Sequence, residues 1–306
     1  MMKNKLFYLS HLFLLLLIGT VVLLPNQRTT SRHYASLLVG IGIIELLFLA
    51  SLYRKRKRGD VGKGLFDIIT FVWIILILWE LTTSVWNVAH PVLVPAPENV
   101  FDTFRQQWRT MLLNVWYSMR LLLLGFSLGL VLGVILGLFA GWIPRVRNFA
   151  YPIANVMAPI PPIVFSPYLV ALMPSFWSAS VLVLLLGVFW PTFLGTINRI
   201  TSMEPQILDS ARMLHPSTTT MVWNILLPYI FPSTIAGLKV SMTTSLLMLN
   251  YAELMGASHG MGYYVQNSIA YANYTHAVAG MIVIGIVVTL LSFLVTQIQK
   301  HVIRWH

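Results

Sequence analysis

The chain has 306 residues, of which 57% are hydrophobic and only 9% are charged. Soluble domains carry about 25% charged residues, so this composition excludes an ordinary soluble domain and predicts a protein embedded in lipid. The absence of cysteine excludes disulfides, thiol catalysis and thiolate metal sites. The net charge of +11 comes from short clusters between apolar runs, so we expect a charge bias across a membrane and no nucleic-acid partner.

Eight segments are apolar enough to span a bilayer, which takes about 20 residues each. In chain order they are Leu6–Leu24, Tyr34–Tyr53, Leu65–Trp86, Val115–Trp142, Phe149–Met173, Trp177–Ile197, Ile225–Leu249 and Ala277–Ile298. The first is too long for the core of a signal peptide and no A-x-A cleavage site follows it, which predicts a retained helix. The expected fold is all-α, a polytopic transmembrane bundle of about eight spans.

The basic residues predict the orientation of these spans. If both termini are cytoplasmic, fourteen of the 20 lysines and arginines fall on the cytoplasmic side, including the run Arg54–Arg58. The other six are Arg28, Arg32, Arg105 and Arg109 on the outer side, and Arg120 and Lys239 within spans. This bias predicts a multi-pass protein of the bacterial inner membrane with both termini in the cytoplasm.

A proline-rich segment, His90–Pro97, follows the third span, and Pro97 with Glu98 suits the start of a helix. Over the next residues, apolar side chains at helical spacing such as Phe101 alternate with a polar face that includes Asp102. We expect a short helix lying in the outer interface of the membrane. The alternative is a polar extension of the fourth span.

Two features within the spans predict close packing and a path. Glycines occur at every fourth residue of the fourth span, at Gly125, Gly129, Gly133, Gly137 and Gly141. This spacing favours close approach of another helix over a pore-lining role. The fifth span carries several prolines, and a broken backbone at membrane depth survives only inside protein or beside water. We therefore take Pro161 and Pro162 as candidates for lining a translocation path.

Charged residues within spans are candidates for function by default. Lys239 lies deep in a span, where a structural pairing and a path-lining role are equally open. Glu80 and Glu253 lie near the outer ends of their spans, where we expect them to reach water, and Glu253 is a further path-lining candidate. The eight histidines are scattered and form no H-x₃-H pair, so we expect no metal site.

The stretch from about Asn198 to Asn224 is too polar to span and too patterned for a plain loop. Glu204 and Pro205 suit a helix start, His215-Pro216 breaks that helix, and Ser217 can cap a second one. The result is a helix, a sharp turn and a helix that re-enters the membrane. Such an amphipathic helix can bind a soluble partner.

This stretch resembles the cytoplasmic motif of permeases of binding-protein-dependent ABC importers, which reads E-A-A, three residues, G, nine residues, I-x-L-P. Here Asp209-Ser210-Ala211 is followed at that spacing by His215 and by Ile225-Leu226-Leu227-Pro228. His215 in place of glycine is a departure, because glycine adopts left-handed backbone more readily. Ala252–Ser258, Gly260-Met261-Gly262 and the Ile160-Pro161-Pro162 segment are similar to the nitrate/sulfonate/taurine branch.

The resemblance covers about residues 93–305 and implies a type I ABC importer-like permease. It divides the chain into two additional helices with a basic loop, residues 1–64, and a permease domain, residues 65–306, with its coupling region at 198–228. The implied contacts with a cytoplasmic ATPase are Glu204, Leu208, Asp209, Ser210, Ala211, Met213, Leu214, His215, Ile225, Leu227 and Pro228. Two ATPase subunits, a second or sister permease and an extracytoplasmic solute-binding protein are the implied partners.

The chain has no P-loop motif, so we expect no cofactor in this chain and ATP hydrolysis on the separate ATPase. The implied solute is small: nitrate, a sulfonate, taurine, bicarbonate or a vitamin precursor. The alternative functions are a secondary transporter or channel driven by an ion gradient, which predicts paired intramembrane carboxylates and inverted repeats, and an intramembrane enzyme. Neither pattern is evident in the sequence.

Overall fold

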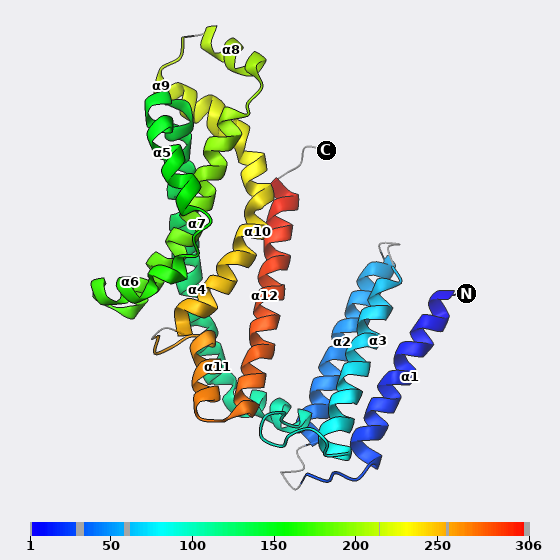
Figure 1. The fold of residues 1–306 in the computed structure, drawn as a ribbon. Helices are drawn as coiled ribbons and strands as arrows, with labels where there is room; N and C mark the ends of the chain where they lie inside the picture. Colours follow the sequence, from blue (N-terminus) through cyan, green and yellow to red (C-terminus); the bar gives the residue numbers. More distant parts are fainter. Residues whose placement is uncertain (1, 29–33, 58–61, 214, 255–256, 303–306) are drawn as a thin grey trace. The chain divides into compact units, whose positions relative to one another are not determined.

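The computed structural model describes residues 2–28, 34–57, 62–213, 215–254 and 257–302, and all regular structure in these ranges is helical (Figure 1). The contacts divide the chain into two compact units. The first comprises Met1–Thr110 with Val265–Ile282, and the second comprises Met111–Tyr264 with Val283–His306.

The first unit contains three apolar helices and the start of a fourth. They are α1 (Met2–Leu23), α2 (Tyr34–Lys57), α3 (Gly64–Glu80) with a π-helical extension η1 (Leu81–Val85), and the first turns of α4 (Pro97–Trp142). One buried cluster joins Leu17 of α1, Leu37 of α2 and Trp73 of α3, and Trp73 is completely buried. The core contacts therefore place α3 with α1 and α2, while the division after residue 64 stays a prediction.

The expected separate interfacial helix after Pro97 is wrong, because α4 runs without a break from Pro97 to Trp142. The alternative, an extension of the fourth span, is what the structure shows. The polar face predicted to meet water is partly buried: Asp102 is 4% exposed and its Oδ1 accepts hydrogen bonds from Ser36 Oγ at 3.0 Å and Arg105 Nε at 2.9 Å. Phe101 packs against α2 at Gly40, where an added Cβ would overlap its ring.

The second unit holds the rest of α4 and a series of helices around it. They are α5 (Pro144–Met157), the 3₁₀ turn η2 (Pro162–Phe165), α6 (Ser166–Leu172), α7 (Phe176–Thr201), α8 (Pro205–Met213), α9 (Thr218–Thr220), the π-helical η3 (Met221–Leu226) and α10 (Leu227–Leu254). Two further helices, α11 (Met261–Ala270) and α12 (Tyr274–Val302), contribute residues to both units.

The number of spans agrees with the prediction of about eight. Seven helices in the described ranges are long and apolar enough to cross a membrane, and a bent pair brings the number to eight. That pair is the proline-rich fifth segment, where Pro144–Met157 and Pro162–Leu172 meet at 87°. The break falls at Pro159 and Pro161, because neither residue can donate a main-chain hydrogen bond to continue the helix.

The glycine ridge of α4 lies directly against α7. A Cβ added at Gly125, Gly129, Gly133, Gly137 or Gly141 would lie only 2.5 to 2.9 Å from the nearest atom of α7. The side chains met are those of Leu184, Val188, Thr192, Thr196 and Ile200, which also recur at every fourth residue. Since both series rise together, α4 and α7 run parallel, with one glycine of α4 opposite one side chain of α7 at each turn.

Candidate coupling segment and translocation path

The coupling segment begins with α8, which lies at one end of the second unit beyond the C-terminus of α7 (Figure 1). Proline at the first position suits a helix start, and the carbonyl of Glu204 accepts hydrogen bonds from the N–H groups of Ile207 and Leu208. Ser210 Oγ donates to the carbonyl of Gln206 at 2.7 Å, which turns this hydroxyl back onto its own helix.

The turn after α8 has the backbone conformation that the family motif assigns to glycine. His215 has a φ of +43°, inside the left-handed region that side chains other than glycine rarely adopt. With histidine in place of the motif glycine, the turn keeps its left-handed backbone conformation, but that conformation is less favourable. The cost of this conformation to a residue with a Cβ is about 1–2 kcal/mol.

The second helix begins as predicted, because Ser217 Oγ accepts a hydrogen bond from the N–H of Thr220 at 3.2 Å. It passes through the π-helical turn η3 before the regular α10 starts at Leu227. Pro228 lacks an N–H for the carbonyl of Asn224, and a wider π turn immediately before a proline relieves the clash with that carbonyl. The end of the motif therefore coincides with a local irregularity in the helix.

A buried cluster ties the coupling segment to three long helices. Ala211 of α8 is 7% exposed and packs in one cluster with Met221, Val222 and Leu226 of η3. The same cluster contains Leu138 of α4, Ile200 at the end of α7, the following Met203, and Ile230 of α10. A displacement of α8 consequently acts on the ends of α4, α7 and α10 through close-packed side chains.

The exposed residues of α8 differ in part from the residues predicted to contact an ATPase. Met213 is 82% exposed, and Glu204, Asp209 and Ser210 are also exposed. Leu208 packs partly against the buried cluster of its own unit. Ile207, which was not among the predicted contact residues, is 40% exposed.

The other predicted coupling residues lie at three kinds of position. Leu214 lies outside the described residues. His215 is exposed on the turn, and Pro228 is exposed at the start of α10. Ile225 and Leu227 are half-buried against the cluster that holds Ala211. These placements leave the contacts with an ATPase as predictions.

A cavity of about 200 Å³ lies where the proline break meets α7 and α10. Pro161 and Pro162, two of the predicted path-lining residues, form one wall. Thr244 and Ser245 of α10 form another, with Pro191 of α7 between them in the lining. The lining contains no charged side chain. Hydroxyls and main-chain groups are therefore the polar groups that a solute would meet there.

The structure does not bring Lys239 and Glu253 into this cavity. Lys239 is exposed on α10, and among the described residues its side chain has no ion pair. The expectation that Glu80 and Glu253 reach water is wrong: Glu80 is 2% exposed and Glu253 is 1% exposed. Glu253 instead lines a second cavity at the far end of α10.

Glu253 is held in a set of hydrogen bonds that joins three segments. Its Oε1 accepts from Ser118 Oγ of α4 at 2.6 Å, and its Oε2 accepts from the N–H of Gly262 at 2.7 Å. Ser118 Oγ also accepts from the N–H of Met261, and Asn114 accepts from the N–H of Gly260. We call this arrangement, Glu253 with Asn114, Ser118 and the 260–262 turn, the carboxylate clasp.

Residues 129–305 match the family described as binding-protein-dependent transport system inner membrane component. The match includes α8, the buried cluster below it and the proline-lined cavity, and it covers more than half of the 306 residues. The chain belongs to this family. It is a membrane-spanning permease subunit of an ABC importer.

Relatives of this permease align over most of their length. The chain is 25% identical over 82% of its length, and 91% of the relative's, to the putative aliphatic sulfonates transport permease protein SsuC of Bacillus subtilis. It is 24% identical to the taurine transport system permease protein TauC of Escherichia coli, over 76% and 87% of the two chains. It is 23% identical to the bicarbonate transport system permease protein CmpB of Synechocystis sp., over 82% and 92%.

Solved structures of ABC transporters share the fold. A chain of the MetNI methionine ABC transporter in an inward-facing conformation superimposes with a TM-score of 0.56 at 18% identity, over 65% of this permease and 99% of that chain. A bacterial ABC transporter involved in the import of alginate gives 0.55 at 13% identity, over 83% and 100%. These likenesses confirm the predicted fold class of a helical ABC importer-like permease.

Sequence reasoning found the coupling segment but missed what supports it. Met221, Val222 and Leu226 are completely buried under α8, yet in the sequence they read only as the apolar start of a span. Their burial depends on contacts with α4 and α7, which are distant in sequence. The permease motif locates α8 and its turn, whereas the packing that supports them is seen only in the structure.

Proposed function

We propose that the chain forms, with a second permease copy or a sister permease, the path by which a small anion enters a bacterial cell. A cytoplasmic ATPase binds α8 and drives the change in the path, and a solute-binding protein delivers the anion on the opposite side. ATP is hydrolysed by the ATPase subunits, and this chain contributes no catalytic residue and holds no cofactor. The orientation that serves this function has both termini in the cytoplasm.

The observation that carries the proposal is the buried cluster between α8 and the ends of α4, α7 and α10. A partner that moved α8 alone would have no effect on a path if α8 were connected through a loose loop. Here Ala211 is packed into the same cluster as Leu138 and Ile230, so the displacement reaches the helices. Two of these helices, α7 and α10, also line the proline-walled cavity.

The need for a second permease follows from the proline break. In this chain Pro161 is exposed, and the apolar side chains beyond it are also exposed, with Val164 at 60% and Tyr168 at 73%. Irregular backbone at membrane depth has to be covered by protein or lie beside water. A second permease facing this side would provide the cover and complete the wall of the path.

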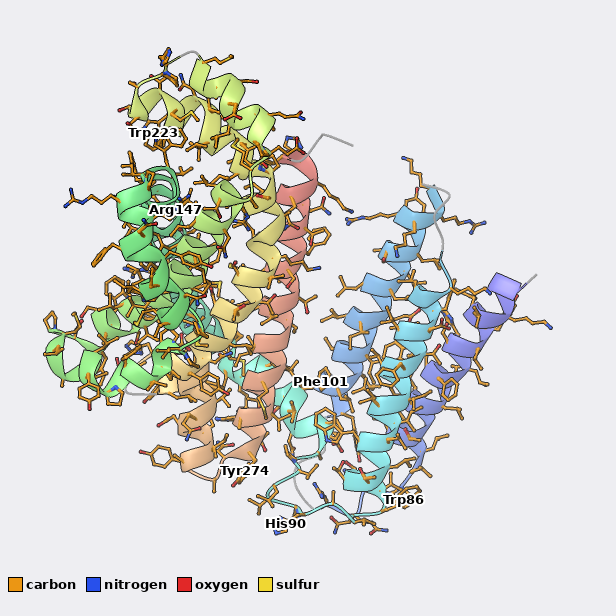
Figure 2. The ribbon with its side chains drawn as sticks, turned by 45° about the horizontal axis from the view of Figure 1, so that its top comes forward. Trp86, His90, Phe101, Arg147, Trp223 and Tyr274 are labelled. Carbon is orange, nitrogen blue, oxygen red and sulfur yellow. The ribbon has the colours of Figure 1, made fainter. Side chains whose placement is uncertain are left out.

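The orientation is supported by basic residues near the coupling segment. Arg147 of α5 and Trp223 of η3 lie at the same end of the second unit (Figure 2). Arg145 and Arg199 belong to the termini of α5 and α7 at that end. Positive charge at the ends of spans is typical of the cytoplasmic side, which is where an ATPase binds.

The choice of an anion comes from the relatives, whose names assign them to sulfonates, taurine and bicarbonate. Substances of this kind are small and carry an anionic oxygen group. The uncharged, hydroxyl-bearing cavity at the proline break is consistent with a solute that passes without being held tightly.

The docking role of α8 can be tested with Asp209→Lys. Reversal of this charge on the exposed side of α8 should reduce recovery of the cognate ATPase in a pull-down by at least about tenfold, since a repelled charge at a contact costs several kcal/mol. Asp67→Lys, the same change at an exposed residue of α3, is the matched control. Normal ATPase recovery with the Asp209 variant contradicts the docking role.

Uptake by proteoliposomes tests the function as a whole. Vesicles that contain the permease, the ATPase and the binding protein should accumulate a radiolabelled sulfonate or bicarbonate. This accumulation should require ATP on the side of the membrane where the ATPase lies. Uptake by the permease alone, driven by an ion gradient and indifferent to ATP, would instead establish the secondary-transporter alternative.

A further inference from the structure

A second cavity of the permease unit has a volume of about 510 Å³ and lies at the opposite end of α7 from α8. It forms where α4, the first turn of α7 and the segment after α10 meet, and all of its lining belongs to the second unit. The volume is within the range of small-molecule binding sites, about 300–1,000 Å³. A solute arriving on the side away from the ATPase would meet this cavity first.

Aromatic rings form much of its wall. Tyr117 of α4 and Phe176 and Trp177 of α7 line the cavity. His259 also lines it and stacks on Tyr117, with ring centroids 4.6 Å apart and an interplanar angle of 27°. The stacked pair presents a fixed apolar surface, while Phe176 and Trp177, 47% and 46% exposed, leave ring surface open to a short hydrocarbon chain.

The first turn of α7 supplies hydrogen-bond donors to the same cavity. Ser175 caps the helix, and its Oγ accepts from the N–H of Ser178 at 3.2 Å. The N–H groups of Phe176 and Trp177 have no acceptor within the helix, because they precede the first complete turn. The N-terminus of this 26-residue helix is also the positive end of its dipole.

Ser180 is a second, independent indication of a ligand. It lines the cavity and is only 7% exposed, yet its hydroxyl has no hydrogen bond with any described residue. Ser245 of α10, by contrast, bonds to its own helix, at the carbonyl of Ser241 at 2.7 Å. Because the residue is otherwise buried and its hydroxyl meets the cavity, the hydroxyl is available to donate to an acceptor inside it.

Glu253 is the lining residue whose charge opposes an anion, and its surroundings reduce that effect. Both of its oxygens are occupied in the carboxylate clasp, by Ser118 and by the N–H of Gly262, and the side chain is 1% exposed. Part of its acceptor capacity is therefore taken up by donors of the permease itself. The Ser180 hydroxyl and the first N–H groups of α7 are donors left open toward the cavity, and they favour a ligand with acceptor oxygens.

We propose that this cavity is a binding site for short-chain organic anions, in which a sulfonate or carboxylate head accepts hydrogen bonds from Ser180 and the first turn of α7. The alkyl chain lies against Tyr117 and Trp177. The inference rests on the proposed function, to which it adds a site for the solute within the permease itself and the class of solute that the site takes.

The test uses the purified full-length chain in detergent with butane-1-sulfonate as the probe, followed by saturation-transfer NMR. The methylene protons should receive saturation from the aromatic wall, and a titration gives the dissociation constant. Ser180→Ala should weaken binding by about tenfold, since a hydrogen bond to a charged group is worth about 1.5–3 kcal/mol and tenfold is 1.4 kcal/mol. Trp177→Ala should reduce the saturation of the chain protons.

Ser233→Ala is the matched control, because that hydroxyl donates to its own helix at Ile230, outside the cavity lining. Equal binding by the Ser180 and Ser233 variants, or no binding by the unmodified chain, overturns the site. Binding of butylammonium in preference to butane-1-sulfonate overturns its assignment to anions. If ATP-driven sulfonate uptake occurs while the probe does not bind here, the site fails and the importer function stands. If the probe binds but uptake ignores ATP, the importer function fails.

Discussion

Glu253 shows how a carboxylate can be kept inside a helical membrane bundle. The clasp provides it with a hydroxyl donor from α4 and a main-chain donor from the turn before α11. The turn has to approach the carboxylate closely, and this is where glycine is required. Gly260 has a φ of +122°, and a Cβ at this residue would lie 2.4 Å from the Glu253 carboxyl carbon.

Gly260→Ala should therefore destabilise the protein. The backbone conformation alone costs a residue with a Cβ about 1–3 kcal/mol, and displacement of the turn would leave buried Glu253 short of a donor. The expected result is a lower melting temperature in detergent and a lower yield of folded protein. Gly285→Ala on α12, where an added Cβ meets nothing within 4 Å, should behave as the unmodified chain. Equal stability of the two variants contradicts the clasp.

At the scale of the element, the contact between α4 and α7 extends over five turns of each helix. Leucine at Gly133 cannot be accommodated, because even a Cβ would lie 2.9 Å from the Cβ of Thr192 and 3.0 Å from the carbonyl of Phe189. Gly133→Leu should cost at least about 1–3 kcal/mol through overpacking and separate the two helices. Thermal stability and complex yield in detergent are the measurements.

The control for this variant is Gly42→Leu in α2, since nothing lies within 4 Å of a Cβ there. It makes the same change of size within another apolar helix. Loss of stability in both variants would mean that the size of leucine, and not the contact with α7, is responsible.

These elements also show what the sequence could predict. The every-fourth-residue spacing from Gly125 to Gly141 indicates a close helix contact, and the prolines indicate the break in the fifth segment. Neither pattern identifies the helix that packs against the glycines. That helix is α7, whose contact residues from Leu184 to Ile200 also recur at every fourth position. The prediction of an interfacial helix was wrong for a related reason. Asp102, on its polar face, bonds to Ser36 of α2, and this contact between distant segments is not visible in the sequence.

The clasp and the second cavity, which Glu253 lines, could not be predicted either. Asn114, Ser118, Glu253 and Gly262 come from segments far apart in the chain, and each by itself is an ordinary polar or small residue. Ser180 reads as one small residue in an apolar span. The coupling segment was more accessible to sequence reasoning, because its helix, its turn and its cap are local and contiguous.

On the scale of the whole molecule, the family match begins at residue 129, after the three helices of the first unit. Those helices share a core, and they also share buried polar contacts with α4. Glu98 of α4 accepts from Asn26 Nδ2 at 2.9 Å and from Ser84 Oγ at 3.0 Å, and Glu98 is only 2% exposed. Removal of α1 and α2 would thus affect α3 and α4 as well.

A chain that lacks residues 2–57 should insert poorly or be recovered in low yield. The deletion exposes Trp73 of α3 and leaves Glu98 without Asn26 in a region where lipid supplies no donor. Recovery of monodisperse protein after detergent extraction is the measurement. Recovery equal to that of the full chain would show that α1 and α2 are dispensable for the fold.

The five glycines of α4 and the five side chains of α7 pair one to one along the two parallel helices. To reach the next matching register, the two helices would have to slide by four residues, about 6 Å, and all five side chains would have to leave their glycines at the same time. A shorter slide would bring the α7 side chains against the α4 backbone between the glycines, so we expect the two helices to move together. Ile200, at one end of this contact, belongs to the cluster under α8, and Leu184, near the other, lines the proline-walled cavity. We therefore expect a displacement applied at Ile200 to be transmitted along α4 and α7 to the wall of that cavity.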